Sequence, residues 1–335
     1  MKLLTSVVAL TAVLTLSATP QAPATRTVAV TFTEWMTPST PPFPHDPEYV
    51  ASDGSVWYTA QRANTIGRLM PAAGDIKEWP LPTPESGPHG LVADKDGNIW
   101  YTGNAAALVG RLDPKTGKIT EYKMPDPRAR DPHTGVFDTD GTFIFTVQAG
   151  NFVGKINPET GLVTLAQPPT ANARPYGIVR AKTGRFFFDE FNSNRIGEFD
   201  PKTMAIKEYV LPDAGARPRR IAMASDDTVY YTDYARGYLG HLDPKTGKVV
   251  EYLSPGGATS RPYAIAVTGD GIVWYCETGV ETKNMLVRFD PATKATQTWP
   301  IISGGSTVRH MVVGKPNELW LALSGVGKIA RAVIQ

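Results

Sequence analysis

The 335-residue sequence has a single cysteine, Cys276. One cysteine excludes an intramolecular disulfide, so the fold has to be stable without cross-links of that kind. Cys276 follows the apolar residues 272–275, at a place where other copies of the repeat described below often have threonine. We therefore expect it to be a small core residue and not a nucleophile.

Runs of one charge are absent as well. The 34 lysines and arginines nearly balance the 32 acidic residues, which leaves a formal net charge of +2. No stripe of basic residues is available to follow a phosphate backbone, so we expect no nucleic-acid partner. Charged residues make up 20% and hydrophobic residues 41% of the chain, which is ordinary for a soluble globular protein.

The start of the chain has the pattern of a secretory signal peptide. Lys2 precedes an apolar stretch at residues 3–16, and small residues stand before the expected cleavage point. The stretch is shorter than the ~20 residues that a transmembrane helix requires, and the A-x-A rule favours cleavage after Ala24. We therefore expect a signal peptide at residues 1–24, no membrane span after cleavage, and a secreted or periplasmic protein at residues 25–335.

What the sequence does contain is a repeat of about 44 residues. The copy at residues 87–125 has four short apolar runs, separated by Asp-Gly, Asn and Asp-Pro-Lys-Thr-Gly turn signals. Strand-sized runs between such turns are typical of antiparallel hairpins. Each copy begins with an anchor residue that follows a proline, or Arg309 in the last copy. The seven anchor residues are His45, His89, His133, Tyr176, Arg219, Tyr263 and His310, spaced 44, 44, 43, 43, 44 and 47 positions apart.

The two ends of the chain complement each other. The seventh copy ends at Gln335 after three strands, and residues 28–38 match the missing fourth strand. The sequence therefore predicts an all-β fold, a seven-bladed β-propeller of four-stranded antiparallel blades, whose last blade is closed by the N-terminal strand. An open β-solenoid or a six-bladed ring with a spare tail would leave this complementarity unexplained. A closed ring has no open sheet edge, and we expect a monomer.

The anchor residues should form a ring around one mouth of the central channel, because the innermost strand of each blade begins there. Four of the five histidines are anchor residues, and convergence of ionisable groups in a concave site is typical of function. The residues after each aromatic strand should form a second ring, made of Gln61, Asn104, Gln148, Glu190, Asp233, Glu277 and Ser324. We therefore expect imidazoles and carboxylates to meet at this mouth. The alternative is that polar residues there only hold neighbouring loops together.

One acidic residue lies two positions before an anchor histidine, in the order Asp131-Pro132-His133. Together with Glu190 on the adjacent blade, Asp131 and His133 are candidate metal ligands. Several histidines on one ring would suit copper, zinc or iron better than magnesium. The pattern alone leaves the identity of any metal open.

A longer motif recurs across the copies. It stands as Gly87-Pro88-His89-Gly90-Leu91, Ile99-Trp100-Tyr101-Thr102 and Asn194-Arg195-Ile196-Gly197, with Ile206-Lys207-Glu208-Tyr209 and Leu81-Pro82. These motifs resemble those of the streptogramin B lyases, or virginiamycin B lyases, and their wider propeller family. The resemblance extends over essentially all of the mature chain. It implies a propeller and a lyase that opens a cyclic depsipeptide by elimination.

In that family a histidine of the last blade takes a proton alpha to the ester carbonyl, a magnesium ion stabilises the enolate, and a carboxylate leaves. By this resemblance the base falls on His310, and the substrate-contacting histidine of the preceding blade falls on Tyr263. The two magnesium-binding glutamates fall on Val308 and close to Ser324. The resemblance thus implies magnesium as a cofactor, whereas these two positions do not supply its ligands.

These observations predict an exported lyase-like enzyme that acts by histidine-assisted elimination on a cyclic ester or lactone-like small molecule. The expected catalytic residues are His310, His133 and Arg219. The expected substrate-binding residues are His45, His89, Tyr176, Tyr263, Arg309, Glu190, Asp233 and Glu277. Two alternatives stay open: a propeller that binds a metal on its histidine ring, and a non-catalytic propeller that binds a ligand or a protein.

Overall fold

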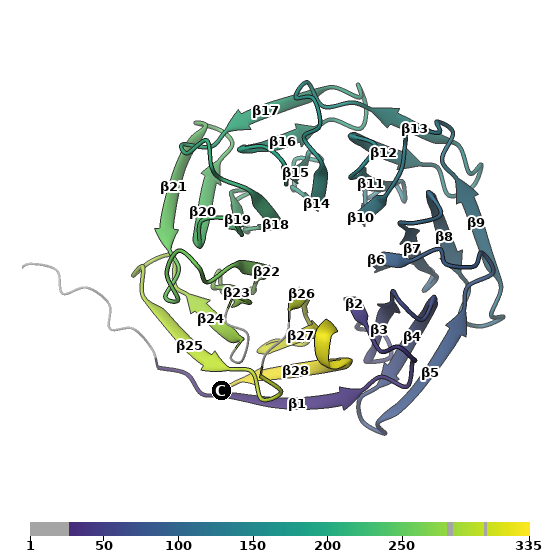
Figure 1. Ribbon diagram of the computed structural model, residues 1–335, viewed down its shortest axis with the longest axis horizontal. Coiled ribbons are helices and arrows are strands. Elements are labelled where there is room, and N and C mark those ends of the chain that lie inside the picture. The colour runs from purple at the N-terminus through teal and green to yellow at the C-terminus, as the bar shows by residue number, and fades with distance from the viewer. Residues whose placement is uncertain (1–26, 280–283, 305–306) are drawn as a thin grey trace, which may run out of the picture.

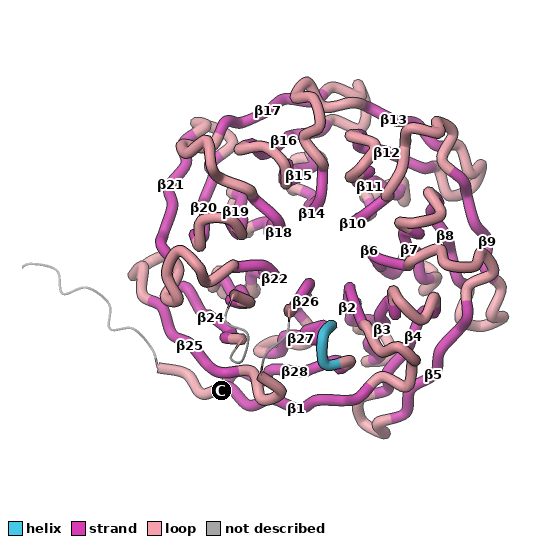
Figure 2. Tube along the Cα trace, in the orientation of Figure 1, coloured by secondary structure: helices cyan, strands magenta, loops and turns pink. Residues whose placement is uncertain are grey.

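The computed structural model describes residues 27–279, 284–304 and 307–335. These residues form seven four-stranded antiparallel sheets arranged as a ring, as Figure 1 shows. The chain is a seven-bladed β-propeller, which confirms the fold that the repeats predict. Figure 2 shows strands and loops throughout the described chain, apart from one short 3₁₀ helix, η1 (Ser324–Val326). The predicted signal peptide lies outside the described residues.

The first six blades each consist of four consecutive strands. Blade 1 contains β2 (Pro44–Val50), β3 (Ser55–Ala60), β4 (Thr65–Met70) and β5 (Asp75–Pro80), and blade 2 contains β6 (Pro88–Ala93), β7 (Ile99–Gly103), β8 (Leu108–Leu112) and β9 (Ile119–Lys123). Blade 3 contains β10 (Pro132–Phe137), β11 (Phe143–Val147), β12 (Phe152–Ile156) and β13 (Val163–Ala166), and blade 4 contains β14 (Pro175–Arg180), β15 (Phe186–Glu190), β16 (Arg195–Phe199) and β17 (Ile206–Val210). Blade 5 contains β18 (Pro218–Met223), β19 (Val229–Asp233), β20 (Tyr238–Asp243) and β21 (Lys248–Leu253), and blade 6 contains β22 (Pro262–Val267), β23 (Val273–Glu277), β24 (Met285–Phe289) and β25 (Thr296–Pro300).

The seventh blade joins the two ends of the described chain. It contains β26 (Val308–Val313), β27 (Glu318–Leu323), β28 (Lys328–Ile334) and, on its outer edge, β1 (Val30–Met36). Strand β1 pairs with β28 along its whole length, and Figure 1 shows the two side by side at the rim of the ring. The predicted closure of the last blade by the N-terminal strand is therefore confirmed.

The recurring glycine of the third strand has a packing reason. In blade 1 a Cβ atom on Gly67 would lie 2.0 Å from Cζ of Tyr58, and in blade 2 a Cβ atom on Gly110 would lie 2.1 Å from Cζ of Tyr101. Each tyrosine ring therefore lies flat over the neighbouring strand, where only glycine leaves room. The Tyr58 hydroxyl then reaches the fourth strand and donates to Glu78 (2.7 Å). Contacts of the tyrosine with the glycine and the glutamate thus connect three adjacent strands of the blade.

The hydrophobic core lies between the blades. Trp57 of blade 1 packs in one cluster with Leu91 and Ile99 of blade 2, so the facing sides of adjacent sheets bury each other. Cys276 is buried in the cluster around blade 6, and burial raises the pKa of its thiol, as expected for an inert core residue. Among the described residues, no helix is long and apolar enough to cross a membrane.

Candidate functional site

The innermost strands deliver two successive residues each to the channel mouth. In β2 the pairing with β3 shifts between Pro44 and Pro47, so that His45 and Asp46 form a β-bulge. The same shift occurs near the start of the other six innermost strands. The first of the two residues in each strand lies nearer the mouth, and these seven residues are called the upper layer: His45, His89, His133, Tyr176, Arg219, Tyr263 and Arg309. The lower layer consists of Asp46, Gly90, Thr134, Gly177, Arg220, Ala264 and His310.

Buried threonines fix the upper layer from one blade to the next. Thr59 donates its hydroxyl to the carbonyl oxygen of His89 (2.7 Å), and Thr102 donates to that of His133 (2.7 Å). Blades 3 and 5 repeat this bond with the same strand position. Four anchor residues, His89, His133, Tyr176 and Tyr263, are thus held by the blade before them, which explains the threonine that recurs after the aromatic pair.

Three of the four histidines predicted to meet do so. The ring centroids of His45 and His89, of His89 and His133, and of His133 and Tyr176 are each 3.7 Å apart. The Tyr176 hydroxyl forms a hydrogen bond with that of Tyr263, which extends the arc across the mouth. The predicted gathering of imidazoles at one end of the channel is therefore confirmed for blades 1 to 3.

Two guanidinium groups face this arc. Arg219 lies over the rings of Tyr263 (4.1 Å), Tyr234 (4.3 Å) and Phe191 (4.8 Å), a cation–π cage. Arg309 lies 5.0 Å from the Phe43 ring. Within the described chain neither arginine forms an ion pair with a carboxylate. A cavity of about 460 Å³ opens above them, lined by His45, His89, His133, Tyr176, Arg219 and Arg309 together with Gln61, Asn104, Ala105, Asp131, Gln148 and Phe191.

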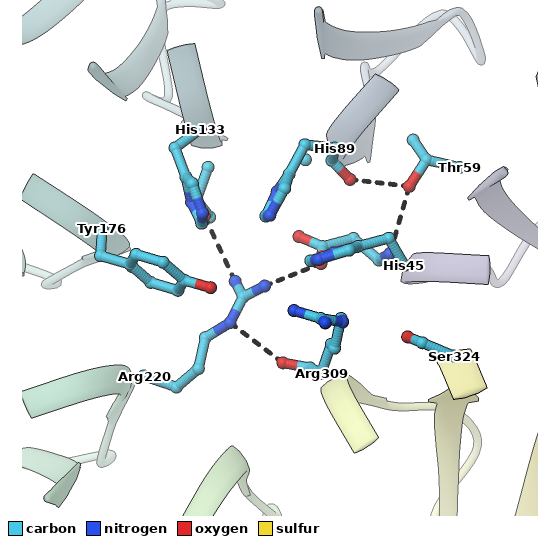
Figure 3. Close-up of polar contacts among 12 residues, drawn as sticks. His45, Thr59, His89, His133, Tyr176, Arg220, Arg309 and Ser324 are labelled. Atoms are coloured by element: carbon cyan, nitrogen blue, oxygen red, sulfur yellow. Dashed lines mark hydrogen bonds and ion pairs between the residues drawn. The ribbon is translucent and has the colours of Figure 1, made fainter. Parts of the chain in front are cut away.

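A third guanidinium closes the channel beneath the cavity. The Arg220 side chain is 1% exposed and donates to Asp46 Oδ1 (2.7 Å), Thr134 Oγ1 (3.2 Å) and the carbonyl oxygen of Arg309 (3.2 Å). Figure 3 shows its guanidinium at the centre of the ring, between His133, His45 and Arg309. One side chain from blade 5 therefore connects blades 1, 3 and 7 across the channel.

The structure corrects the placement of His310. Val308 pairs with Leu323 as Pro44 pairs with Ala60, so Val308 takes the proline position and Arg309 becomes the anchor residue. His310 lies one residue further along, in the lower layer, and its buried Nδ1 has no hydrogen-bond partner among the residues that the structure describes. Since the last copy lacks the anchor proline, the sequence alignment was one residue out of register in this blade.

The second predicted ring is also shifted in three blades. Gln61, Asn104 and Gln148 line the cavity as expected, but each follows the last residue of its strand. The carboxylates Glu190, Asp233 and Glu277 are themselves the last residues of β15, β19 and β23. Because side chains alternate between the two faces of a strand, a shift of one residue turns them away from the cavity. The positions at the mouth belong to Phe191, Tyr234 and Thr278.

The three carboxylates have local structural partners instead. Glu190 accepts from the Ser193 hydroxyl (2.7 Å), and Asp233 forms an ion pair with Arg236 (2.8 Å). Glu277 accepts from the backbone N–H of Gly256 (2.7 Å). The prediction that carboxylates and imidazoles share the mouth is therefore wrong for these residues. Gln61, Asn104 and Gln148 each lie three residues after the second aromatic residue of their strand, and the same count from Phe188 would have identified Phe191 as a cavity residue.

The predicted metal ligands are not brought together. Among the described residues, His45, Asp46 and His89 are the one group of potential ligands whose donor atoms lie within 4.8 Å of one another, and Asp131, His133 and Glu190 form no such group. The Asp131 carboxyl accepts a hydrogen bond from Asn104 instead. Burial raises its pKa to about 6.

The site does not fit the magnesium that the family resemblance implies. Val308 is fully buried and offers no oxygen, and the Ser324 hydroxyl donates to the Pro44 carbonyl (2.6 Å). Beneath the mouth, the Asp46 carboxylate is already bound to Arg220, and the buried Asp189 carboxyl accepts from the backbone N–H of Gly177. A divalent cation prefers several oxygen ligands and is repelled by a neighbouring guanidinium.

Burial sets the charge state of the imidazoles. It lowers the pKa of His45 to about 4 and that of His310 to about 3. The pKa values of His89 and His133 are also lowered, by burial first and then by neighbouring positive charge. The mouth therefore presents neutral imidazoles and two cationic guanidiniums at neutral pH.

One consequence is a pH-dependent stability that His89 should carry. Folded His89 stays neutral, whereas in the unfolded chain it takes a proton below about pH 6.5, so the unfolded state binds more protons and stability falls as pH falls. We expect the unfolding free energy of the wild type to drop between about pH 6 and pH 4 by up to about 1.4 kcal/mol per pH unit more than that of His89→Gln. Urea unfolding of both proteins at several pH values measures this difference. Parallel curves would mean that the pKa of His89 is the same in the folded and unfolded states.

The fold and the site define a seven-bladed β-propeller with a concave, polar site at one channel mouth. The chain belongs to the virginiamycin B lyase family, whose family model matches residues 48–284. Two solved structures are similar to it with a TM-score of 0.82 each: virginiamycin B lyase from Staphylococcus aureus, at 26% identity over 91% of this chain and 99% of that one, and a streptogramin B lyase, at 27% identity over 91% and 98%. A catalytically inactive histidine-to-alanine variant of the Staphylococcus aureus enzyme with quinupristin matches at 25% identity over 91% and 99%, also with a TM-score of 0.82. No curated protein sequence matches the chain.

Proposed function

We propose that the channel mouth is the active site of a carbon–oxygen lyase that opens a cyclic ester or lactone-like small molecule. The observation that carries this proposal is the cavity of about 460 Å³, in which neutral imidazoles face Arg219 and Arg309, neither of which is paired with a carboxylate of the described residues. Membership of the virginiamycin B lyase family supports the reaction class. The departures at Val308 and Ser324 support a substrate or a charge-stabilising group different from the family's own.

The reaction needs a base and a stabiliser of negative charge. An imidazole of the mouth takes the proton from the carbon next to a carbonyl, and the electron pair forms a carbon–carbon double bond. The adjacent carbon–oxygen bond of the ester breaks, and the leaving group departs as a carboxylate. No water is consumed, so the opened product has the same mass as the cyclic substrate.

The guanidiniums of Arg219 and Arg309 would stabilise the enolate oxygen and the leaving carboxylate. Both line the cavity, and the aromatic cage keeps Arg219 in place. Guanidinium groups bind carboxylates through two parallel hydrogen bonds, which suits a leaving carboxylate. Positive charge supplied in this way would take the part that the resemblance gives to magnesium.

A screen of cyclic depsipeptides, quinupristin among them, and of lactones whose ester oxygen is attached to the carbon β to a carbonyl group tests this function. Elimination should give a ring-opened product of unchanged mass, whereas hydrolysis would add one water. We expect Arg309→Met to lower kcat/KM by about 10²- to 10³-fold, as loss of one oxyanion donor does, and dialysis against EDTA to leave turnover intact. Arg128→Met, at an exposed arginine outside the cavity, is the matched control.

Two results would contradict the proposal. One is tight binding of these compounds with no turnover, which would favour the ligand-binding alternative. The other is turnover that EDTA abolishes and zinc or copper restores, which would favour a metal on His45, Asp46 and His89, the group whose donor atoms lie close together. Export, which the first 24 residues predict, is part of the proposal and is tested by locating the protein after expression with and without them.

A further inference from the structure

We propose that His45, oriented by Asp46, is the base of this elimination. The inference rests on the proposed function and adds the residue that performs its proton transfer. The family resemblance assigns that role to His310, in the last blade. The contacts of the two histidines differ in ways that favour the first blade.

The position of the His45 proton follows from its neighbour. Nδ1 of His45 lies 2.8 Å from Asp46 Oδ1, and the same oxygen accepts from Arg220 (2.7 Å). A carboxylate that is ionised can only accept hydrogen bonds, so Nδ1 carries the proton and donates. Although burial raises the pKa of Asp46, the Arg220 guanidinium holds it below its usual range, which keeps the carboxylate ionised.

This tautomer leaves a lone pair on Nε2 of His45. His45 lines the cavity, and its Nε2 makes no hydrogen bond to the described residues. An imidazole whose Nδ1 is held by a carboxylate and whose Nε2 faces a reactant is arranged as a general base, and the carboxylate then stabilises the imidazolium. The charged or titratable groups around His45 are Asp46, Arg220, Arg309, His89, His133 and His310.

His133 has the opposite arrangement. Its Nδ1 lies 2.9 Å from Thr134 Oγ1, and that oxygen accepts from Arg220 (3.2 Å). Within the described chain the Thr134 hydroxyl proton has no other acceptor, so it points to Nδ1 of His133 and the ring proton sits on Nε2. His133 therefore offers a donor to the cavity, suited to a carbonyl oxygen and not to a proton on carbon.

His310 is less suited to the role in this chain. It lies in the lower layer and is not among the residues that line the cavity. Its Nδ1 has no partner among the described residues, so no group fixes its tautomer. Within the described residues, the carboxylate–imidazole contact at the cavity belongs to blade 1.

Kinetics of single variants separate the two histidines. We expect His45→Gln to lower kcat/KM by about 10²- to 10⁴-fold, and Asp46→Asn to lower kcat by at least about tenfold with little change in KM, because a neutral amide no longer stabilises the imidazolium. His241→Gln is the matched control, since His241 stacks on Tyr230 away from the channel. Full turnover in His45→Gln together with loss in His310→Gln would overturn the proposal.

Nitrogen NMR of protein labelled at its five histidines tests the assignment without any substrate. We expect the Nδ1–H tautomer for His45 and the Nε2–H tautomer for His133, with each signal identified by its loss in the Gln variant. The Nε2–H tautomer at His45 would overturn the proposal even if the protein turns over esters. The converse outcome is a protein that shows the expected tautomers and opens no ester. That result would contradict the proposed function, and His45 would then have no such reaction to catalyse.

Discussion

A chain that begins at residue 38, and so lacks β1, should fail to form the closed ring. We expect it to lose most of the about 5–15 kcal/mol that stabilises a typical domain and to aggregate at concentrations where a chain that begins at residue 25 is monomeric. The reason is that β28 would become an open edge with a row of unpaired backbone groups. Thermal unfolding followed by circular dichroism, with size-exclusion chromatography, measures both effects.

Three kinds of contact are lost together in this deletion. Strand β1 pairs with β28 from Val30–Ile334 to Met36–Lys328, and Trp35 packs against Trp320 with ring centroids 5.5 Å apart. Glu34 also forms an ion pair with Lys328 (2.8 Å). A synthetic β1 peptide should restore part of the stability in trans. A truncated monomer that melts within a few degrees of the longer chain would show that ring closure does not depend on this strand.

Arg220→Met should give the largest loss of stability among single substitutions at the mouth. We expect a decrease of about 3–5 kcal/mol, since the Asp46 carboxylate would remain buried without its partner. The double variant Asp46→Leu with Arg220→Met should recover much of this loss, because apolar residues in place of both members of a buried ion pair are often tolerated. Denaturant unfolding of the two single variants and the double variant gives the coupling energy.

Arg219→Met provides the comparison. Arg219 is only partly buried and forms no ion pair with the described carboxylates, so its loss should cost less than that of Arg220. If Arg220→Met lowered the unfolding free energy no more than Arg219→Met, the guanidinium at the centre of the channel would not be stabilised by Asp46. Turnover should fall in both variants, because Arg219 would face the substrate and Arg220 holds the carboxylate that orients His45.

Local patterns in the sequence predicted the fold because the strands and turns of each blade are specified by residues close together in the chain. Turn residues end each strand, the aromatic pair marks the second strand, and the glycine that follows marks the close packing of Tyr58 over Gly67. The match of residues 28–38 to a missing strand predicted the closure by β1. Three of the anchor histidines were found in the same way, because a regular repeat places equivalent residues at equivalent points of the ring.

Prediction failed where an error of one residue changes the face of a strand. Glu190 lies at the end of β15 and Phe191 after it. The spacing of three residues from Tyr58 to Gln61, applied from Phe188, leads to Phe191, which lines the cavity, whereas the prediction counted two. In blade 7 the missing proline allowed His310 to be placed where Arg309 lies. The error in blade 4 was a miscount along the repeat, whereas the error in blade 7 lies at a bulge, whose register depends on pairing with the neighbouring strand.

The sequence by itself determined seven blades, the strand that joins its two ends and the supply of imidazoles at one mouth, because these follow from spacing along the chain. Only the tertiary structure decided which groups meet there. Asp46 and Arg220 are 174 positions apart, and their contact arises because the ring brings blades 1 and 5 across a narrow channel. No local sequence pattern predicts a contact between residues so far apart in the chain. This contact nevertheless keeps the Asp46 carboxylate next to His45.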